Sequence, residues 1–266
     1  MSASAVFFCL LVVMASTAAS AQTSGSASGT LTINGKAIKL SHAHAQDIKS
    51  PWGKGRLIRV VLSDVPISDE TMEDDNGVVE LIQAGKVQAM EFSFTPEGKP
   101  SGGNLVHGTK SVAFTEASFH FEKQVFDGKT AAGKVWTEPP TKFEEMKYEC
   151  TATFKAPVQS EAKPTAQGAA AAASGPGKVT IEFIRAAHAG DAAALKKISG
   201  PVYQPQLEGP DAKAYVKSLA DWLKPGLTVV RVYEWSTFAR VDLAMKDGSG
   251  VTPFTLAKIN GEWKAK

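Results

Sequence analysis

The sequence predicts an α+β protein. We expect a mostly antiparallel β domain, a sandwich or barrel with one short helix, joined by a flexible linker to a cone of helices on an antiparallel meander. Apolar and polar residues alternate through most of residues 29–157. Residues 158–177 are mainly Ala, Pro, Ser, Gly and Gln, which bury too little apolar surface to offset the entropy of ordering. Residues 178–266 show helical periods first and a period of two from residue 227 onward.

The first 21 residues have the pattern of a cleaved signal peptide. An apolar run over residues 5–15 is followed by small residues that end at Ala21, after which we expect cleavage. The run is shorter than the roughly twenty apolar residues of a spanning helix. An uncleaved anchor is the alternative, because no Lys or Arg precedes the run. We expect a periplasmic or secreted protein with no membrane span after cleavage.

Charge and cysteine content narrow the function classes. Residues 22–155 carry 15 basic and 17 acidic side chains, and residues 178–266 carry 13 and 9. Neither part has a stripe of Lys and Arg interleaved with aromatics, so we expect no nucleic-acid partner. Cys9 lies in the predicted signal peptide, which leaves Cys150 without a disulfide partner. Alternation in its strand predicts that Cys150 is a buried thiol.

The predicted β domain, residues 29–157, begins with a hairpin. Residues 30–33 and 36–40 alternate, and Asn34-Gly35 supplies the two positive-φ positions of a tight turn. Five further alternating runs predict strands over residues 57–62, 87–94, 118–126, 130–137 and 142–154. The domain is therefore expected to be mostly antiparallel sheet.

One interruption of this alternation predicts the short helix of the β domain. Asn76-Gly77 is followed by apolar residues at 78, 79, 81 and 82, which fit a helical period. Gly85 then provides a C-terminal stop.

The segment from Ser41 to Ala45 contains two histidines with metal-binding potential. His-x-His on a strand turns both imidazoles to one face, which offers two nitrogens to zinc or copper. A third ligand could come from Asp47, His107 or His120, but their order and spacing match no metal motif. His42 and His44 are therefore candidate metal ligands, and no resident cofactor is expected.

The orientation of the two histidines depends on the strand register. If the hairpin parity continues, His42 and His44 share the Ile38 face and point toward the core or a pocket mouth. A bulge near Ser41 would instead bury Ala43 and Ala45 and leave both histidines in solvent.

The predicted second domain, residues 178–266, begins with helices. Residues 178–188 fit a strand or a helix, and the length and the closing Gly190 favour a helix. Asp191 is expected to cap a helix over residues 192–198. Asp211 is expected to do the same for an amphipathic helix that ends at Lys224-Pro225-Gly226.

A meander follows, with strands predicted near residues 227–235, 238–246 and 251–259 and a turn at Asn260-Gly261. If Ser236-Thr237 is a two-residue turn, Tyr233 lies opposite Arg240 and Arg231 lies opposite Asp242. The helices are expected to cover the other face, which carries Val230, Val232, Ala239, Val241, Leu243 and Met245.

The polar face of this hairpin is the candidate ligand surface. Arg231, Tyr233, Trp235 and Arg240 share it and could line a shallow polar-aromatic site. The alternative is that Arg231 and Asp242 form a solvated ion pair with no ligand. No catalytic residue is expected on this face.

Sequence phrases resemble two families. The first domain, through GTLTINGKAIKLSHAHA, LIRVVLSDVPI, VFDGKTAAGKVWT and YECTATFKAPV, resembles an uncharacterised domain of exported bacterial proteins, which implies boundaries and compartment but no activity. Helices followed by a meander, with Ala189-Gly190-Asp191 and Gly261-Glu262-Trp263-Lys264, resemble the nuclear transport factor 2-like superfamily. That resemblance implies a cone whose enzymes hold an acid and a His or Tyr inside. No such pair can be carried over, because a helix end and a cap explain His188 and Asp191.

The short motifs of common enzymes are missing from the sequence, including Gly-x-Ser-x-Gly, His-Glu-x-x-His, a phosphate loop and a dinucleotide fingerprint. We therefore expect a non-catalytic protein that binds a small molecule or a protein partner. One alternative is a cone-type hydrolase or isomerase. Another is a metal-binding protein that uses His42 and His44.

Overall fold

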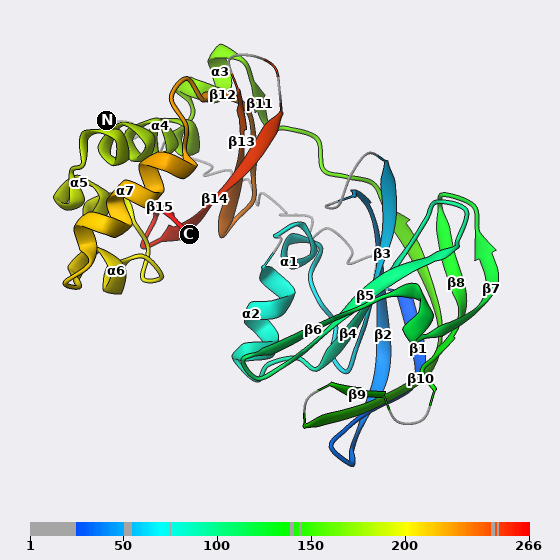
Figure 1. Cartoon of the computed structure of the whole chain (residues 1–266). Helices are drawn as coiled ribbons and strands as arrows, with labels where there is room; N and C mark the ends of the chain where they lie inside the picture. The colour runs from blue at the N-terminus through cyan, green and yellow to red at the C-terminus, as the bar shows by residue number, and fades with distance from the viewer. Residues whose placement is uncertain are drawn as a thin grey trace, which may run out of the picture.

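The computed structural model describes residues 25–50, 55–74, 76–138, 141–143, 145–245, 248 and 250–266 (Figure 1). The predicted signal peptide, residues 1–21, lies outside these ranges. Among the described helices, none is long and apolar enough to cross a membrane.

The expected α+β class is wrong, because strands make up 48% of the described residues and helices 25%, and the helices are few and short. The expected sandwich or barrel is also replaced by one large curled sheet. Its strand order is β6 (Lys110–Phe114), β5 (Pro100–His107), β4 (Ala89–Phe94), β3 (Arg56–Ser63), β2 (Lys36–Lys49), β1 (Gly25–Ile33), β10 (Met146–Gln159), β8 (Thr130–Trp136) and β7 (His120–Phe126), and β9 (Thr141–Phe143) pairs with β10. Local alternation predicted strands, but it carries no information on how distant strands pair.

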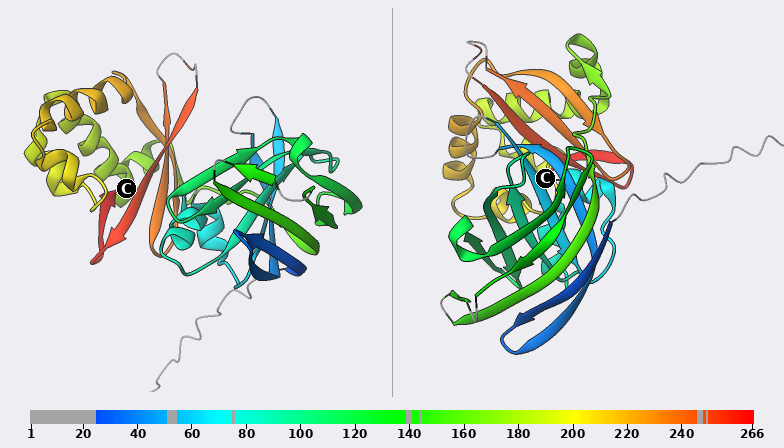
Figure 2. Two further views of the ribbon diagram at one scale, coloured as in Figure 1. Left: turned by 60° about the horizontal axis from the view of Figure 1, so that its bottom comes forward. Right: turned by 90° about the vertical axis from the view of Figure 1, so that its right-hand side faces the viewer.

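The large sheet is strongly curled (Figure 2), and aromatic contacts across the inside of the curl show how far it bends. The ring of Phe94 on β4 lies 4.5 Å from that of Phe121 and 5.3 Å from that of Phe126, both on β7. Five strands separate β4 from β7 in the sheet order. The concave face therefore closes on one apolar core, which also buries Cys150. Burial raises the pKa of the Cys150 thiol to about 12.

The first hairpin has the predicted geometry. Asn34 and Gly35 have φ values of 49° and 82°, and Leu31 pairs with Ile38. Two consecutive left-handed residues match the strand twist, which is why Asn-Gly identified this turn.

Two short helices lie on the outer face of the large sheet, α1 (Asp69–Glu73) and α2 (Gly77–Gln83). The prediction of a helix after Asn76-Gly77 is confirmed by α2. Met72 and Ile82 pack on Val61 in a small core of their own. Because Val60 and Leu62 face the main core, β3 is buried on both sides. A 3-10 turn, Glu116–Ser118, precedes β7.

The second sheet has the order β11 (Ala166–Gln167), β12 (Thr228–Glu234), β13 (Phe238–Ala244), β14 (Val251–Ile259) and β15 (Glu262–Ala265). Tyr233 pairs with Arg240 and Arg231 with Asp242, as predicted. A bulge between Val229 and Arg231 changes the face of the preceding residues. Val229 therefore enters the apolar core in place of Val230.

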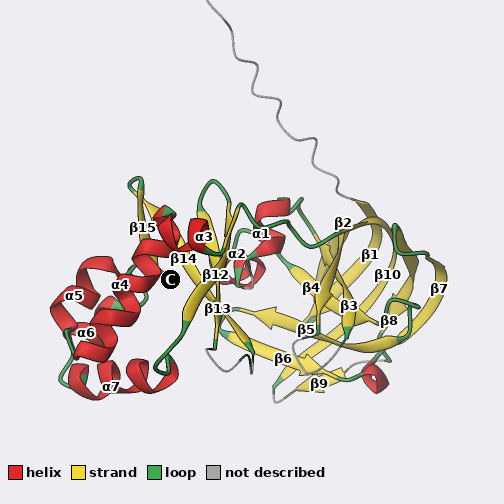
Figure 3. Ribbon diagram, turned by 90° about the horizontal axis from the view of Figure 1, so that it is seen from above, coloured by secondary structure: helices red, strands yellow, loops and turns green. Residues whose placement is uncertain are grey.

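Five helices cover one face of this sheet: α3 (Ala169–Ala173), α4 (Gly175–Ala189), α5 (Ala192–Ile198), α6 (Gln204–Glu208) and α7 (Ala212–Trp222). In Figure 3, α4–α7 lie on one side of the sheet and the large sheet lies on the other. Asp191 caps α5, since its Oδ1 accepts a hydrogen bond of 2.9 Å from the Ala194 amide. Asp211 precedes α7 but makes no side-chain cap bond, so that expectation is wrong.

The expectation of a flexible linker over residues 158–177 is corrected by its secondary structure. The segment contains the end of β10, β11, α3 and the start of α4. The amides of Thr165 and Gly168 donate to carbonyl groups of β12. A Cβ on Gly177 would lie 2.0 Å from the Ala171 oxygen, so small residues here permit close packing of α3 on α4. The domain boundaries predicted on either side of the segment remain a prediction.

Candidate functional site

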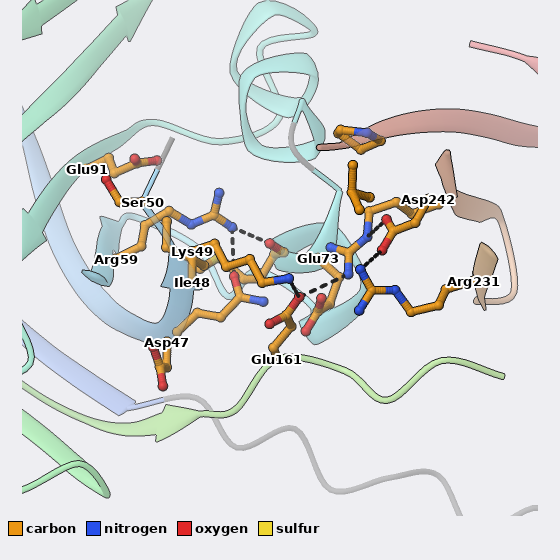
Figure 4. Close-up of a pocket in the computed structure, with 15 residues that line it drawn as sticks. Asp47, Ile48, Lys49, Ser50, Arg59, Glu73, Glu91, Glu161, Arg231 and Asp242 are labelled. Atoms are coloured by element: carbon orange, nitrogen blue, oxygen red, sulfur yellow. Dashed lines mark hydrogen bonds and ion pairs between the residues drawn. The ribbon is translucent and has the colours of Figure 1, made fainter. Parts of the chain in front are cut away.

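A cleft of about 720 Å³ lies between the two sheets (Figure 4). One wall is the outer face of β2–β4 together with the end of α1, and the other is the helix-free face of β12–β14. Charged side chains of both signs line it: Asp47, Lys49, Arg59, Glu73, Glu91, Glu161, Arg231, Arg240 and Asp242. Strands far apart in the sequence therefore meet at one polar site.

Arg59 organises the wall made by the large sheet. It lies on β3 and is only 8% exposed. Its Nη2 donates to Gln46 Oε1 at 3.0 Å and to the carbonyl oxygen of Met72, which joins β2 and β3 to α1. Hydrogen bonds to a buried guanidinium offset its desolvation. Arg59 Nε is buried and bonds to no described residue.

Two carboxyl groups on the same wall have raised pKa values. Burial raises the pKa of Glu91, on β4, and the charge of Arg59 opposes this. Burial likewise raises the pKa of Glu73, at the end of α1, against the opposing influence of Arg240 and Gln46. Desolvation favours the neutral form of a carboxyl, so both groups titrate above the usual range. Raised pKa values within one cleft are common at functional sites.

The opposite wall contains the predicted ligand surface. Arg231 Nη2 lies 2.8 Å from Asp242 Oδ2, and Asp242 is buried. The guanidinium carbon of Arg240 lies 4.1 Å from the centre of the Tyr233 ring. Trp235 stacks beyond Tyr233, with ring centres 6.2 Å apart. Arg231 and Arg240 therefore line the cleft, whereas Tyr233 and Trp235 lie outside its described lining, and the Tyr233 ring supports Arg240.

Glu161 connects the two walls. It belongs to the segment between β10 and β11, and its carboxylate lies 3.9 Å from Lys49 Nζ and 3.4 Å from both Arg56 Nη1 and Arg240 Nη2. Figure 4 shows it between Lys49 on one side and Arg231 on the other. The expected linker thus supplies a residue to the site.

Contacts beside the cleft hold the sheets together. The Glu70 carboxylate on α1 accepts hydrogen bonds from Ser236 Oγ at 2.6 Å, the Thr237 amide at 2.7 Å and Thr237 Oγ1 at 2.6 Å. Lys266 Nζ pairs with buried Asp74 and lies 2.9 Å from Glu80 Oε1. The hairpin turn and the last strand are both fixed to α1 and α2 as a result.

Sequence reasoning missed Arg59, Glu73, Glu91 and Glu161. A signal was present for two of them, because Arg59 and Glu91 each interrupt a strongly apolar strand that has little solvent-facing surface. Glu73 and Glu161 gave no such signal. Their role depends on how distant segments come together.

The two candidate metal ligands, His42 and His44, belong to no cluster of potential metal ligands among the described residues. His44 is 1% exposed, and its Nε2 accepts the Ile67 amide at 3.1 Å. Burial lowers the pKa of His44 to about 4, against the opposing charge of Asp69. Ala43 enters the main core, as the bulge alternative predicted, but His44 is buried rather than solvated. Within the described residues, no group of three or more His, Cys, Asp or Glu side chains could hold a metal ion.

Apolar side chains fill the space between the helices and the five-stranded sheet. Phe183 of α4 is fully buried against this sheet, and its ring centre lies 5.1 Å from that of Phe254 on β14. Leu195, Val232 and Val241 are also fully buried in this core. A cone-type enzyme would hold its site in this space between the helices and the sheet. The cleft lies on the other, helix-free face of the same sheet.

Comparison with protein-family models, curated proteins and solved structures finds no match to this chain. The resemblances to an exported bacterial domain and to the nuclear transport factor 2-like superfamily stay expectations. What the cleft can bind follows from its own residues.

Proposed function

We propose that this protein binds a small charged molecule in the cleft between its two sheets and catalyses no reaction on it. The observation that carries the proposal is the convergence of charged side chains from both sheets on one concavity. Its volume, about 720 Å³, is within the range of roughly 300 to 1,000 Å³ typical of small-molecule sites.

The lining favours a ligand without aromatic rings. No aromatic side chain is present among the described residues that line the cleft, so there is no platform on which a nucleobase or a sugar ring could stack. Charged groups supply specificity instead, since guanidinium and carboxylate groups bind oppositely charged ligand atoms directionally. Arg231 and Arg240 keep the role that the sequence suggested for them.

The alternatives have less support. A cone-type hydrolase or isomerase needs an open interior, where Phe183 and its neighbours pack. Metal binding through His42 and His44 would require His44 to give up its bond with the Ile67 amide. Export to the periplasm or medium remains part of the proposal, and N-terminal sequencing of the purified mature protein would test the expected cleavage after Ala21.

Thermal shift against a library of amino acids, short peptides, polyamines, organic acids and sugar phosphates tests the proposed binding. We expect at least one charged compound to raise the melting temperature of the wild type. The shift should be lost in Arg231→Ala, because that wall then loses the more exposed of its two guanidinium groups. Lys196→Ala is the control, since Lys196 pairs with Glu208 on the helices away from the cleft. The proposal would be contradicted if a compound raised the melting temperatures of Arg231→Ala and Lys196→Ala equally, or if no compound raised the melting temperature of the wild type.

A further inference from the structure

Resting on the proposed binding function, we propose that the ligand is a short peptide with free ends, whose ammonium group binds at Glu91 and whose carboxylate binds at Arg231. This deepens the proposal by naming a ligand class and two recognition groups. The argument starts from the distribution of charge between the two walls.

The two walls of the cleft present different groups to a ligand. On the large sheet and α1, Asp47 is paired with Arg56 at 2.6 Å, which leaves Glu73 and Glu91 as the other carboxyl groups that line this wall. On the five-stranded sheet, Arg231 and Arg240 face a single carboxylate, Asp242. Carboxyl groups on one wall and an excess of guanidinium groups on the other favour a molecule with a cation at one end and an anion at the other.

Glu91 is the carboxyl group on the wall of the large sheet that lacks a partner. Its side chain is partly buried, lines the cleft and makes no hydrogen bond or ion pair with any described residue. Nearby Arg59 is held by Gln46 and the Met72 carbonyl instead. A partly buried carboxyl without a partner costs free energy, and an ammonium group with three N–H donors would satisfy it.

Arg231 is the matching group on the basic wall. About a third of its side chain is exposed, and among the described residues only its Nη2 has a partner, Asp242. The remaining face of a planar guanidinium suits a carboxylate, which it can bind through two parallel N–H bonds. Figure 4 places Glu91 and Arg231 on opposite sides of the cleft.

The middle of the cleft and its size favour a peptide over a single amino acid. Ile48, Val251 and Pro253 also line the cleft and supply apolar surface. A tripeptide spans at most about 10 Å when extended. Its small side chains would pack against this apolar surface while its charged ends bind the charged groups.

Isothermal titration calorimetry with three probes tests the inference: Ala-Ala-Ala, its N-acetyl derivative and its C-terminal amide. We expect the free tripeptide to bind and each blocked form to bind about tenfold more weakly, because each loses one charge-assisted contact. In Glu91→Gln, the free and N-acetyl forms should bind alike, while the penalty for the C-terminal amide persists. Glu97→Gln, the same change at a fully exposed carboxylate, should behave as wild type.

Three results would overturn the inference: equal binding of free and blocked peptides by the wild type, retention of the full discrimination by Glu91→Gln, or no binding of any of the three. Binding of the three peptides to the wild-type protein tests the inference even if Glu91→Gln fails to fold. A library compound that binds the wild type but not Arg231→Ala, with no tripeptide binding, would leave the proposed function standing and refute only the peptide class.

Discussion

The two faces of the five-stranded sheet have opposite chemistry. The face toward α3–α7 is apolar and packed, whereas the face toward the large sheet carries Arg231, Arg240 and Asp242 around the cleft. Tyr233 and Phe238 on this second face are also buried, at 3% and 4% exposed, although they belong to neither sheet's apolar core. Because side chains alternate along each strand, one sheet thus has an apolar packed face and a charged face that lines the cleft.

The largest expected effect is on the packed face. Phe183→Ala removes a fully buried ring that contacts Phe254 and Tyr203, and we expect a loss of about 3 to 5 kcal/mol in the free energy of unfolding. Urea denaturation measures it. Val202→Ala, at a position 64% exposed, is the control and should change little. A loss below about 1 kcal/mol for Phe183→Ala would contradict a packed interior.

A smaller effect is expected where the polar face is held against α1. Glu70→Gln weakens three hydrogen bonds to the β12–β13 turn, and because Glu70 is only partly buried we expect a loss of about 1 kcal/mol. Amide hydrogen exchange at Thr237 should become faster. Glu116→Gln, at an exposed carboxylate on the 3-10 turn, should leave the Thr237 amide unchanged.

The same contact predicts a dependence on pH. Burial alone would raise the pKa of Glu70, but hydrogen bonds from Ser236 and Thr237 lower it below its usual value of 4.5. The contact is therefore fully present above pH 4.5 and is lost as the pH falls through the lowered pKa. Chemical shifts of the Thr237 amide should follow this titration in the wild type and not in Glu70→Gln.

The smallest effect is expected for Tyr233, which contacts Arg240 but does not itself line the cleft. Tyr233→Leu removes the ring under Arg240, and we expect ligand affinity to fall by roughly 2- to 10-fold, as for the loss of a partly buried cation–π contact. Tyr233→Phe keeps the ring and should bind as wild type. Calorimetry with a compound found in the library compares them, and equal affinity in all three proteins would remove Tyr233 from the support of the site.

Turns and the pairing of neighbouring strands could be predicted from the sequence, whereas the pairing of distant segments could not. Asn34-Gly35 identified its hairpin, and the turn at Ser236-Thr237 gave the correct pairing of Tyr233 with Arg240, because both depend on neighbouring residues. The bulge at Val230 was not visible, since a single extra residue leaves the alternation plausible on either side. Residues 158–177 were misread because small residues indicate flexibility by composition, while Gly177 serves close packing.

Only the part of the candidate site that depends on local alternation could be predicted from the sequence. Arg231 and Arg240 share a face of one hairpin, which a period of two reveals. Glu73, Glu91 and Glu161 come from a helix, a strand and a connecting segment that meet only when the two sheets lie face to face. Their common location is a property of the tertiary structure.

The central claim is that the two sheets hold a fixed face-to-face arrangement that creates the cleft. Spin labels on Lys49→Cys and Val251→Cys, at opposite rims, report this directly by electron paramagnetic resonance. Cys150 does not compete for the label, because it is buried and its pKa is raised to about 12. A fixed arrangement predicts one narrow inter-label distance distribution. A broad distribution, as two independently moving halves would give, would contradict it.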